Sequence, residues 1–303
     1  MSGVSFPDVV LQPDEIGRQL SRLRGSLEAG PDASIIIPVN ARMDLALVHN
    51  LLSDLFQYQG HSLLEFVLVI NNYAPEAPPQ EIEQYRRLGA NLAAVPDVRR
   101  PGEVVIISAR ALGARTSRSP YNLHFDADVR IPDATALVDW YIQSLSRGAG
   151  LAYSRVEFYN LPDKPATRVR LVIHHSTRWA KRSLLGIPTA RGSNYAITRA
   201  LFLQLYEEGR LSVDIQVGPA ARLAGARSVY SGRKEHRVYT SARKQSGRWL
   251  RLFPYFLHRL YFNLKATPNS LRRTHPGARW KGFDRESEIR QSRSAPPFKG
   301  DRR

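Results

Sequence analysis

Short apolar runs and amphipathic stretches follow one another along the first half of the chain. The runs Ser34–Pro38, Leu64–Ile70 and Tyr121–Phe125 are apolar or β-branched over most of their length. Runs of this kind are typical of strands buried on both faces of a parallel sheet. Val104–Ile107 has the same character and predicts a further short strand.

Stretches with a helical repeat of apolar residues separate these runs. The repeat predicts a helix over Leu45–Tyr58, with apolar residues at 45, 48, 51, 52 and 55, and a helix of small residues over Ser108–Ser117. Pro13–Leu27 and Gln80–Gly89 also have helical character. The alternation of strands and helices predicts an α/β fold with a mostly parallel, doubly wound sheet.

Polar residues stand where the predicted strands end, which is where ligands bind in such sheets. They are Pro38–Asn40, Asn71–Asn72 and Asp126–Asp128. Two carboxylates two positions apart suit one hard cation such as Mg²⁺ or Mn²⁺, with Asp128 bound directly and Asp126 directly or through water. An ordinary polar turn is the alternative interpretation of this D-x-D.

Six segments resemble, in order, the motifs of the GT-A glycosyltransferases, and within them the large family 2 of inverting enzymes. The resemblance spans about residues 33 to 245, and the segments are Ser34–Asn40, Leu64–Asn72, Ser108–Gly113, Tyr121–Pro132, Arg191–Arg199 and Val213–Asp214 with Gly218, Arg222, Leu223 and Gly225 downstream. It implies a Rossmann-like α/β fold and a transferase that moves a sugar from a nucleotide-diphosphate donor to an acceptor hydroxyl.

The resemblance also implies a role for each segment. The nucleotide-binding residues would be Pro38, Val39, Asn40, Arg42, Asn71, Asn72, Arg110, Asp126 and Ala127. The residues facing the sugar or the acceptor would be Arg191, Gly192, Ser193 and Asn194, although this segment is also explained by a plain loop before a strand.

A divalent cation, Mn²⁺ or Mg²⁺, is the cofactor that the resemblance implies. Its ligands would be Asp126, Asp128 and His236, with the last an incidental residue of a basic loop in the alternative interpretation. Arg237 and Arg243 would hold the diphosphate.

Asp214 matches the family's catalytic base and would deprotonate the acceptor hydroxyl, with inversion at the sugar. The alternative is that Ser212 or Asp214 only caps a helix. A retaining transferase of the same fold is a second hypothesis, because a fold does not determine stereochemistry.

Three of these motifs depart from the family pattern, at four positions. Asn71 and Asn72 stand where the family usually has an acid, and an amide offers the base a donor as well as an acceptor. Val213 replaces the first acid of the base pair, and Ala111 replaces an Asn beside Arg110. A protein that binds sugar nucleotides without transferring them is therefore a further hypothesis.

Charge is distributed unevenly along the 303 residues. Residues 227–303 contain 20 basic and 5 acidic residues, whereas the first 226 contain 24 basic and 22 acidic ones. This asymmetry predicts an anionic partner for the last quarter. A non-catalytic protein that binds anions or nucleic acid is thus a competing hypothesis, but the quarter has no helix-turn-helix, RNP or zinc pattern, so nucleic acid is not favoured.

The basic aromatic segment Trp249–Lys265 places Trp249, Leu252, Phe256, Leu260 and further apolar residues on one helical face. Such a helix suits either an anionic membrane surface or packing on the catalytic domain. Lone Trp140 and Trp179 could stack on a sugar, but a place in the core is the simpler interpretation.

Composition and segment lengths narrow the class of protein. The chain is 43% apolar and has no Cys, which excludes disulfides, Cys-based zinc sites and thiol catalysis. The longest apolar run, Leu63–Ile70, contains Glu65 and is far shorter than the ~20 residues that span a bilayer. The first residues do not resemble a signal peptide. We expect a cytoplasmic protein, with a peripheral position at the inner membrane face as the variant.

The domain boundaries predicted from these patterns are an N-terminal extension (1–32), a catalytic domain (33–245) and a basic C-terminal helix with a tail (246–303). The catalytic domain would divide into a nucleotide half, about 33–132, and an acceptor half, about 133–245. Its acceptor would be a saccharide, a lipid or a small hydroxyl compound.

Overall fold

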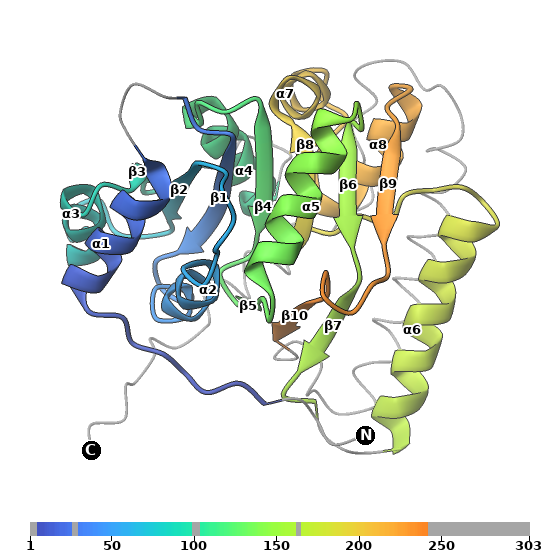
Figure 1. Cartoon of the computed structure of the whole chain (residues 1–303), viewed down its shortest axis with the longest axis horizontal. Coiled ribbons are helices and arrows are strands. Elements are labelled where there is room, and N and C mark those ends of the chain that lie inside the picture. The colour runs from blue at the N-terminus through green and yellow to red at the C-terminus, as the bar shows by residue number, and fades with distance from the viewer. Residues whose placement is uncertain (1–4, 26–29, 99–103, 162–164, 242–303) are drawn as a thin grey trace.

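The structure, a computed structural model, describes residues 5–25, 30–98, 104–161 and 165–241. Its centre is a seven-stranded sheet with the strand order β3-β2-β1-β4-β8-β6-β9 (Figure 1). These strands are β1 (Ala33–Asn40), β2 (Leu64–Asn71), β3 (Asn91–Val95), β4 (Tyr121–Phe125), β6 (Leu151–Ser154), β8 (Asn194–Thr198) and β9 (Ser228–Ser231). The sheet is mostly parallel, and β8 runs antiparallel to both of its neighbours.

Helices cover both faces of the sheet (Figure 1). They are α1 (Pro13–Arg24), α2 (Val48–Leu55), α3 (Gln80–Arg87), α4 (Val105–Thr116), α5 (Ala134–Ser146), α7 (Arg199–Glu207) and α8 (Val217–Leu223), the last preceded by the 3₁₀ turn η1 (Asp214–Gln216). A further helix, α6 (Pro165–Ser183), lies at the edge of the molecule. The predicted α/β fold with a mostly parallel sheet is therefore confirmed.

Alternating side chains of the buried strands supply two apolar cores, one on each face. In β1, Ile35 and Ile37 join the core that also receives α1, α2 and α5, whereas Ile36 joins the core formed with α4, α7 and α8. Because both faces are covered, the strand is apolar at nearly every position.

A small second sheet lies beside the large one. It consists of β5 (Val129–Arg130), β10 (Val238–Ser241) and β7 (Val156–Tyr159), in the order β5-β10-β7. β5 pairs antiparallel with β10, so the segment after Asp128 lies next to the strand that follows His236.

The prediction of a strand at Val104–Ile107 was wrong. Val104 precedes α4, and Val105–Ile107 form its first turn. A run of four apolar residues fits a strand or a buried helical turn equally well, and packing decides between them. The strand lies instead at Asn91–Val95, an edge strand of half-buried residues without a strong apolar run.

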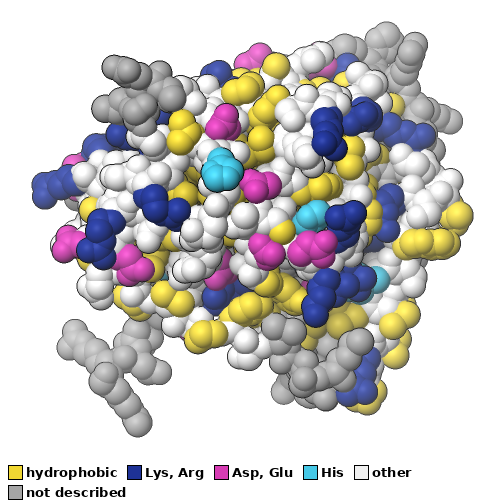
Figure 2. Space-filling view, in the orientation of Figure 1, with side chains coloured by type: hydrophobic (Ala, Val, Ile, Leu, Met, Phe, Trp, Pro, Cys, Tyr) yellow, Lys and Arg dark blue, Asp and Glu magenta, His cyan; other side chains and the backbone are white. Residues whose placement is uncertain are grey.

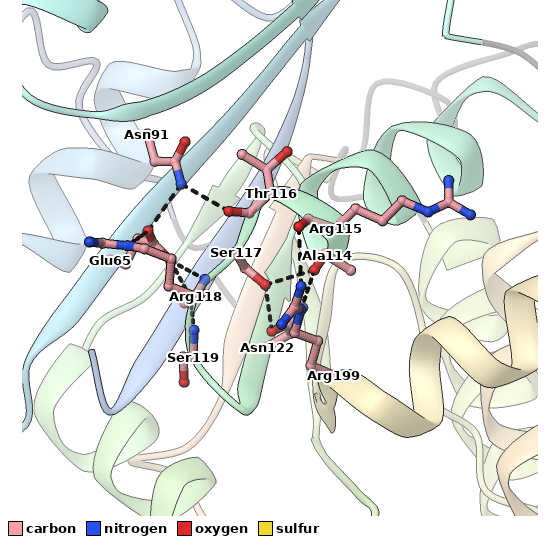
Figure 3. A network of polar contacts seen from close by, with 11 residues as sticks. Glu65, Asn91, Ala114, Arg115, Thr116, Ser117, Arg118, Ser119, Asn122 and Arg199 are labelled. Atoms are coloured by element: carbon pink, nitrogen blue, oxygen red, sulfur yellow. Dashed lines mark hydrogen bonds and ion pairs between the residues drawn. The ribbon is translucent and has the colours of Figure 1, made fainter. Parts of the chain in front are cut away.

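A polar network connects the amino-terminal ends of β1, β2 and β3 (Figure 3). It lies at the opposite edge of the sheet from the carboxyl ends, where the sequence predicts ligand binding. The buried Glu65 carboxylate accepts hydrogen bonds from Ser34 Oγ (2.6 Å), Asn91 Nδ2 (3.0 Å) and Arg118 Nε (2.7 Å). Burial disfavours the charged carboxylate, but these bonds together hold its pKa below the usual value. A cavity of about 380 Å³ opens here. Because Glu65 and Arg118 satisfy each other, we place no functional site in it.

Two features predicted near the C-terminus lie outside the described residues, namely the segment Trp249–Lys265 and Arg243. In the part of the chain that the structure describes, no helix is both long and apolar enough to cross a membrane.

Candidate functional site

The guanidinium of Arg110 joins three segments that are far apart in the sequence. It pairs with the carboxylate of Asp126 just after β4, and its Nε lies 3.1 Å from Oδ1 of Asp214 at the start of η1. Its Nη2 also donates to the carbonyl oxygen of Gly192. Side chains from three separately predicted motifs and the backbone of a fourth thus meet at the carboxyl end of β4.

The backbone at residue 192 lies so close to Arg110 and Asp214 that only glycine fits there. A Cβ at this position would overlap the carboxylate of Asp214 and lie 2.9 Å from Nη2 of Arg110. The missing side chain therefore lets the acceptor-side segment contact both charged groups.

Arg110 is completely buried, whereas Asp126 and Asp214 remain 30% and 17% exposed. Burial alone would lower the pKa of Arg110, but the charges of Asp214 and Asp126 raise it above its ordinary value. The arginine consequently stays charged. From its buried position it holds the two partly exposed carboxylates in place.

Two buried aromatic side chains that the sequence analysis did not single out lie near Arg110. The His124 ring stacks on Tyr195 with centroids 4.7 Å apart, and Arg110 lies 5.6 Å from the centre of the Tyr195 ring. Burial and, second, the charge of Arg110 hold the pKa of His124 well below its usual range, so its imidazole is neutral. A polar residue inside an apolar strand was the only sequence signal for His124.

Six of the predicted nucleotide-binding residues lie where β1 and β2 end, and they are Pro38, Val39, Asn40, Arg42, Asn71 and Asn72. Oδ1 of Asn40 accepts from Asn72 Nδ2 (3.1 Å) and from the backbone N–H of Arg42 (3.0 Å). Asn72 has φ 64°, a left-handed conformation that Asn tolerates. Asn71 differs because it is buried and donates to the carbonyl of Val39. Asn40 and Asn72, rather than Asn71, are thus the amides at the surface, and Pro38 and Val39 are buried behind them.

The D-x-D carboxylates are only partly surrounded by protein. Asp126 pairs with Arg110, while Oδ1 of Asp128 accepts from Thr240 Oγ1 (3.3 Å) and its backbone carbonyl from Tyr159. Among the described residues, no three His, Cys, Asp or Glu side chains come together as a metal site. The donor set still suits Mg²⁺ or Mn²⁺, which commonly take one or two carboxylates and complete their shell with water and substrate phosphates.

His236 is not brought together with these carboxylates. It is buried, its Nδ1 lies 2.7 Å from Ser231 Oγ, and its ring stacks on Trp140 with centroids 4.9 Å apart. Burial lowers its pKa, which keeps the ring neutral. These contacts favour a packing role, and a role as a metal ligand stays a prediction.

The segment Arg191–Asn194 reaches the site through its backbone. The side chain of Asn194 is buried, accepts from Tyr141 and donates to Ser154. Ser193 is buried too, while Nη2 of Arg191 lies 3.4 Å from Nδ1 of His174. Gly192 is therefore the member of this segment that touches the charged cluster.

Other predicted residues lie in different surroundings. Arg237 is held 3.3 Å from the carboxylate of Glu157, so a diphosphate would have to compete with that acid. Trp140 is half-buried against the core, whereas Trp179 is 54% exposed and not a core residue.

Asp214 does not cap the following helix. Val213 occupies the N-cap position of η1, and Oε1 of Gln216 reaches back to the backbone N–H groups of Ser212 (2.6 Å) and Val213 (3.2 Å). This capping leaves the Asp214 carboxylate to face Arg110 and the surface.

Comparison with known proteins gives distant structural similarity only. No protein-family profile and no curated protein sequence matches the chain. A mannosyltransferase from Pyrobaculum calidifontis, solved with GDP-Man and Mn²⁺, superposes with a TM-score of 0.48 and 16% identity, over 77% of this chain and 66% of that one.

S. aureus TarS, residues 1–349 with UDP-GlcNAc, gives a TM-score of 0.47 at 16% identity, over 71% of this chain and 61% of the other. Glucosyl-3-phosphoglycerate synthase from Mycobacterium tuberculosis, solved with Mn²⁺, UDP and glucosyl-3-phosphoglycerate, gives 0.45 at 15% identity, over 87% and 86%. The chain thus spans less than two thirds of the length of the first two. These similarities are too distant to transfer a ligand or an activity, so function has to be inferred from the chain's own residues.

Proposed function

We propose that the protein is a metal-dependent glycosyltransferase that uses a nucleotide-diphosphate sugar. The observation that carries this proposal is the convergence of Arg110, Asp126, Gly192 and Asp214, because each was assigned to a different glycosyltransferase motif from the sequence alone. Their meeting point at the carboxyl end of a parallel strand is where α/β sheets bind ligands.

The donor nucleotide would lie across the ends of β1 and β2. Asn40 and Asn72 present amide groups there, and amides offer a base edge both a donor and an acceptor. The base therefore need not be uracil, and the panel of nucleotides described below identifies which base the site binds.

Asp126 and Asp128 would hold the divalent cation. When bound, the cation supplies charge neutralisation for the diphosphate leaving group. The buried positive charge of Arg110 would fix the orientation of Asp126 toward that position.

Asp214 would act as the general base. In a single displacement, the acceptor oxygen forms a bond to the anomeric carbon while the bond to the diphosphate oxygen breaks, and the hydroxyl proton goes to Asp214. Displacement from the opposite face inverts the anomeric centre. The partial exposure of Asp214 supports this role, since an acceptor hydroxyl has to reach the carboxylate.

Binding without transfer is the second candidate. Val213 replaces the first acid of the base pair, and Asp214 is already paired with Arg110. A protein with this function would bind the nucleotide sugar but would not transfer the sugar to an acceptor.

A thermal-shift panel with UDP, GDP, ADP, CMP and dTDP, each with and without Mn²⁺, tests the donor site. We expect one nucleotide to raise the melting temperature by several degrees with Mn²⁺, because a ligand that binds only the folded state stabilises it. Asp128→Asn should abolish the shift, whereas Asp214→Asn and the exposed control Asp14→Asn should keep it. If no nucleotide shifts the wild type, the proposed diphosphate site is wrong.

A further inference from the structure

Helix α6 presents an apolar face to solvent. Six of the eight large apolar side chains that are exposed in the described residues lie between residues 169 and 185, and they are Val169 (57%), Val172 (64%), Ile173 (42%), Trp179 (54%), Leu184 (69%) and Leu185 (45%). Figure 1 shows α6 at the edge of the molecule, outside the helices that cover the sheet, and Figure 2 shows apolar side chains gathered along that edge.

These residues form one continuous face. Val169, Val172 and Trp179 stand at i, i+3 and i+10, and Ser176 fills the position i+7 between them. Leu184 and Leu185, which follow directly after the helix, are exposed as well. Contiguous exposed apolar surface of this kind marks an interaction site more often than scattered single residues do.

The opposite face of α6 is held against the protein. Nη2 of Arg178 donates to the carbonyl of Thr189 (2.6 Å), and the His174 ring packs on Phe158 with centroids 5.5 Å apart. The guanidinium of Arg182 lies 3.6 Å from the centre of the Tyr230 ring. The apolar face is thus held outward by contacts on the inner side.

Charge selects among the partners that such a face accepts. The 19 residues of α6 contain five basic residues and no acidic one. Arg168 is exposed beside the apolar stripe, whereas Arg178, Lys181 and Arg182 are half-buried. A helix of net positive charge with Trp and aliphatic side chains on its exposed face matches an anionic bilayer. The headgroups attract the helix, and the apolar face enters the interface.

We propose that the apolar face of α6, residues 169–185, docks on an anionic phospholipid surface with the helix in the membrane plane. The surface is distinct from Trp249–Lys265, and it does not depend on the proposed enzymatic function. If that function holds as well, α6 brings the site close to a bilayer, because Arg191 next to Gly192 contacts His174 of α6. This consequence favours a lipid acceptor and rests on the proposed function.

Co-sedimentation of the full chain with vesicles tests the proposal. We expect binding to vesicles of phosphatidylglycerol and phosphatidylcholine, weaker binding at high salt, and little binding to pure phosphatidylcholine. The double variant Val172→Glu/Trp179→Glu should reduce the affinity at least about tenfold. The double variant Val10→Glu/Met43→Glu is the matched control, since these exposed apolar residues lie elsewhere, and it should bind like the wild type.

A second measurement avoids the two introduced charges. Vesicles with brominated acyl chains should quench the fluorescence component that Trp179→Phe removes, because Trp179 would enter the interface. Unchanged vesicle binding by the α6 double variant, or no quenching of that component, overturns the proposal. So does size-exclusion chromatography in which the α6 variant converts a wild-type dimer to a monomer without affecting vesicle binding. The thermal-shift panel is independent of all these results.

Discussion

Gly192 is the residue on which the geometry of the charged cluster most depends. A methyl group there would overlap Asp214 and crowd Arg110. We predict that Gly192→Ala lowers transfer activity at least about tenfold, because small displacements of catalytic groups are costly. It should also lower the free energy of unfolding by about 1–3 kcal/mol, as overpacking does. Steady-state kinetics and urea unfolding measure the two effects.

The control for this substitution is Gly30→Ala. A Cβ at Gly30 meets no atom within 4 Å, so we expect neither activity nor stability to fall. Equal effects of the two substitutions would mean that the contact between Gly192 and the carboxylate has no functional importance.

His124 makes the protein sensitive to acid. Its folded-state pKa is lowered by burial and by Arg110, so below about pH 6.5 the unfolded chain binds a proton that the folded chain does not. Stability contributed by the neutral ring is thus lost as the pH falls. We predict that the loss of unfolding free energy between pH 7.5 and pH 5.5 is about 1 kcal/mol smaller in His124→Phe than in the wild type.

Urea unfolding at the two pH values checks this prediction, with His61→Phe as the control. This control removes an exposed histidine that is not part of either apolar core. An identical pH dependence in His124→Phe and the wild type would show that His124 is not kept neutral by its surroundings.

At the scale of the element, α4 packs closely on the sheet at Gly113. A Cβ at Gly113 would lie 2.5 Å from Cγ2 of the buried Ile36, whereas one at Gly17 in α1 would meet only the end of Leu88 at 3.2 Å. Alanine favours a helix over glycine by about 1 kcal/mol at both positions. We predict that Gly17→Ala is neutral or stabilising, but that Gly113→Ala destabilises by about 1–3 kcal/mol because of overpacking.

Chemical denaturation of both variants makes the comparison. If Gly113→Ala stabilised the protein as much as Gly17→Ala, the prediction would be wrong. The sheet would then accommodate the added methyl group without a loss of unfolding free energy. The buried residues of α4 include Ala109, Ala111 and Ala114. Destabilisation by Gly113→Ala would indicate that the small size of these side chains allows the close packing of α4 on the sheet.

The strands with long apolar runs were predictable from the sequence, and those without were not. β1, β2 and β4 are buried on both faces and appear at the predicted places. β3 was missed because an edge strand of half-buried Asn, Leu, Ala and Val lacks that signal. Val104–Ile107 was assigned to the wrong class because local pattern cannot reveal that this turn packs on β1 and β2.

The members of the charged cluster were predictable individually, but not their arrangement. Arg110, Asp126 and Asp214 were named from motifs, while their contact depends on tertiary structure. His236 lies apart from the carboxylates because Ser231 and Trp140 hold its ring, and nothing local in the sequence indicates those partners. Tyr195 and His124 were missed because buried polar aromatics have no distinctive spacing.

At the scale of the whole molecule, the excess of basic residues and the candidate site lie in different parts of the chain. The first 226 residues are nearly balanced in charge and contain the candidate site, whereas residues 227–303 carry 20 basic and 5 acidic residues. Helix α6, which has five basic residues and no acidic one, belongs to the first part, so attraction to anionic surfaces is not confined to the basic last quarter. A purely electrostatic binder would need no cluster of Arg110, Asp126 and Asp214.

Release of nucleoside diphosphate from a panel of nucleotide sugars tests the central claim most directly. We predict that the wild type releases it from one donor with Mn²⁺, that EDTA stops the release, and that Asp214→Asn lowers it at least about 100-fold while still binding the nucleotide. Binding of a nucleotide without release from any donor, in the presence of saccharide or lipid acceptors, would contradict the claim. Release that Asp214→Asn leaves unchanged would contradict the role of this residue as the base.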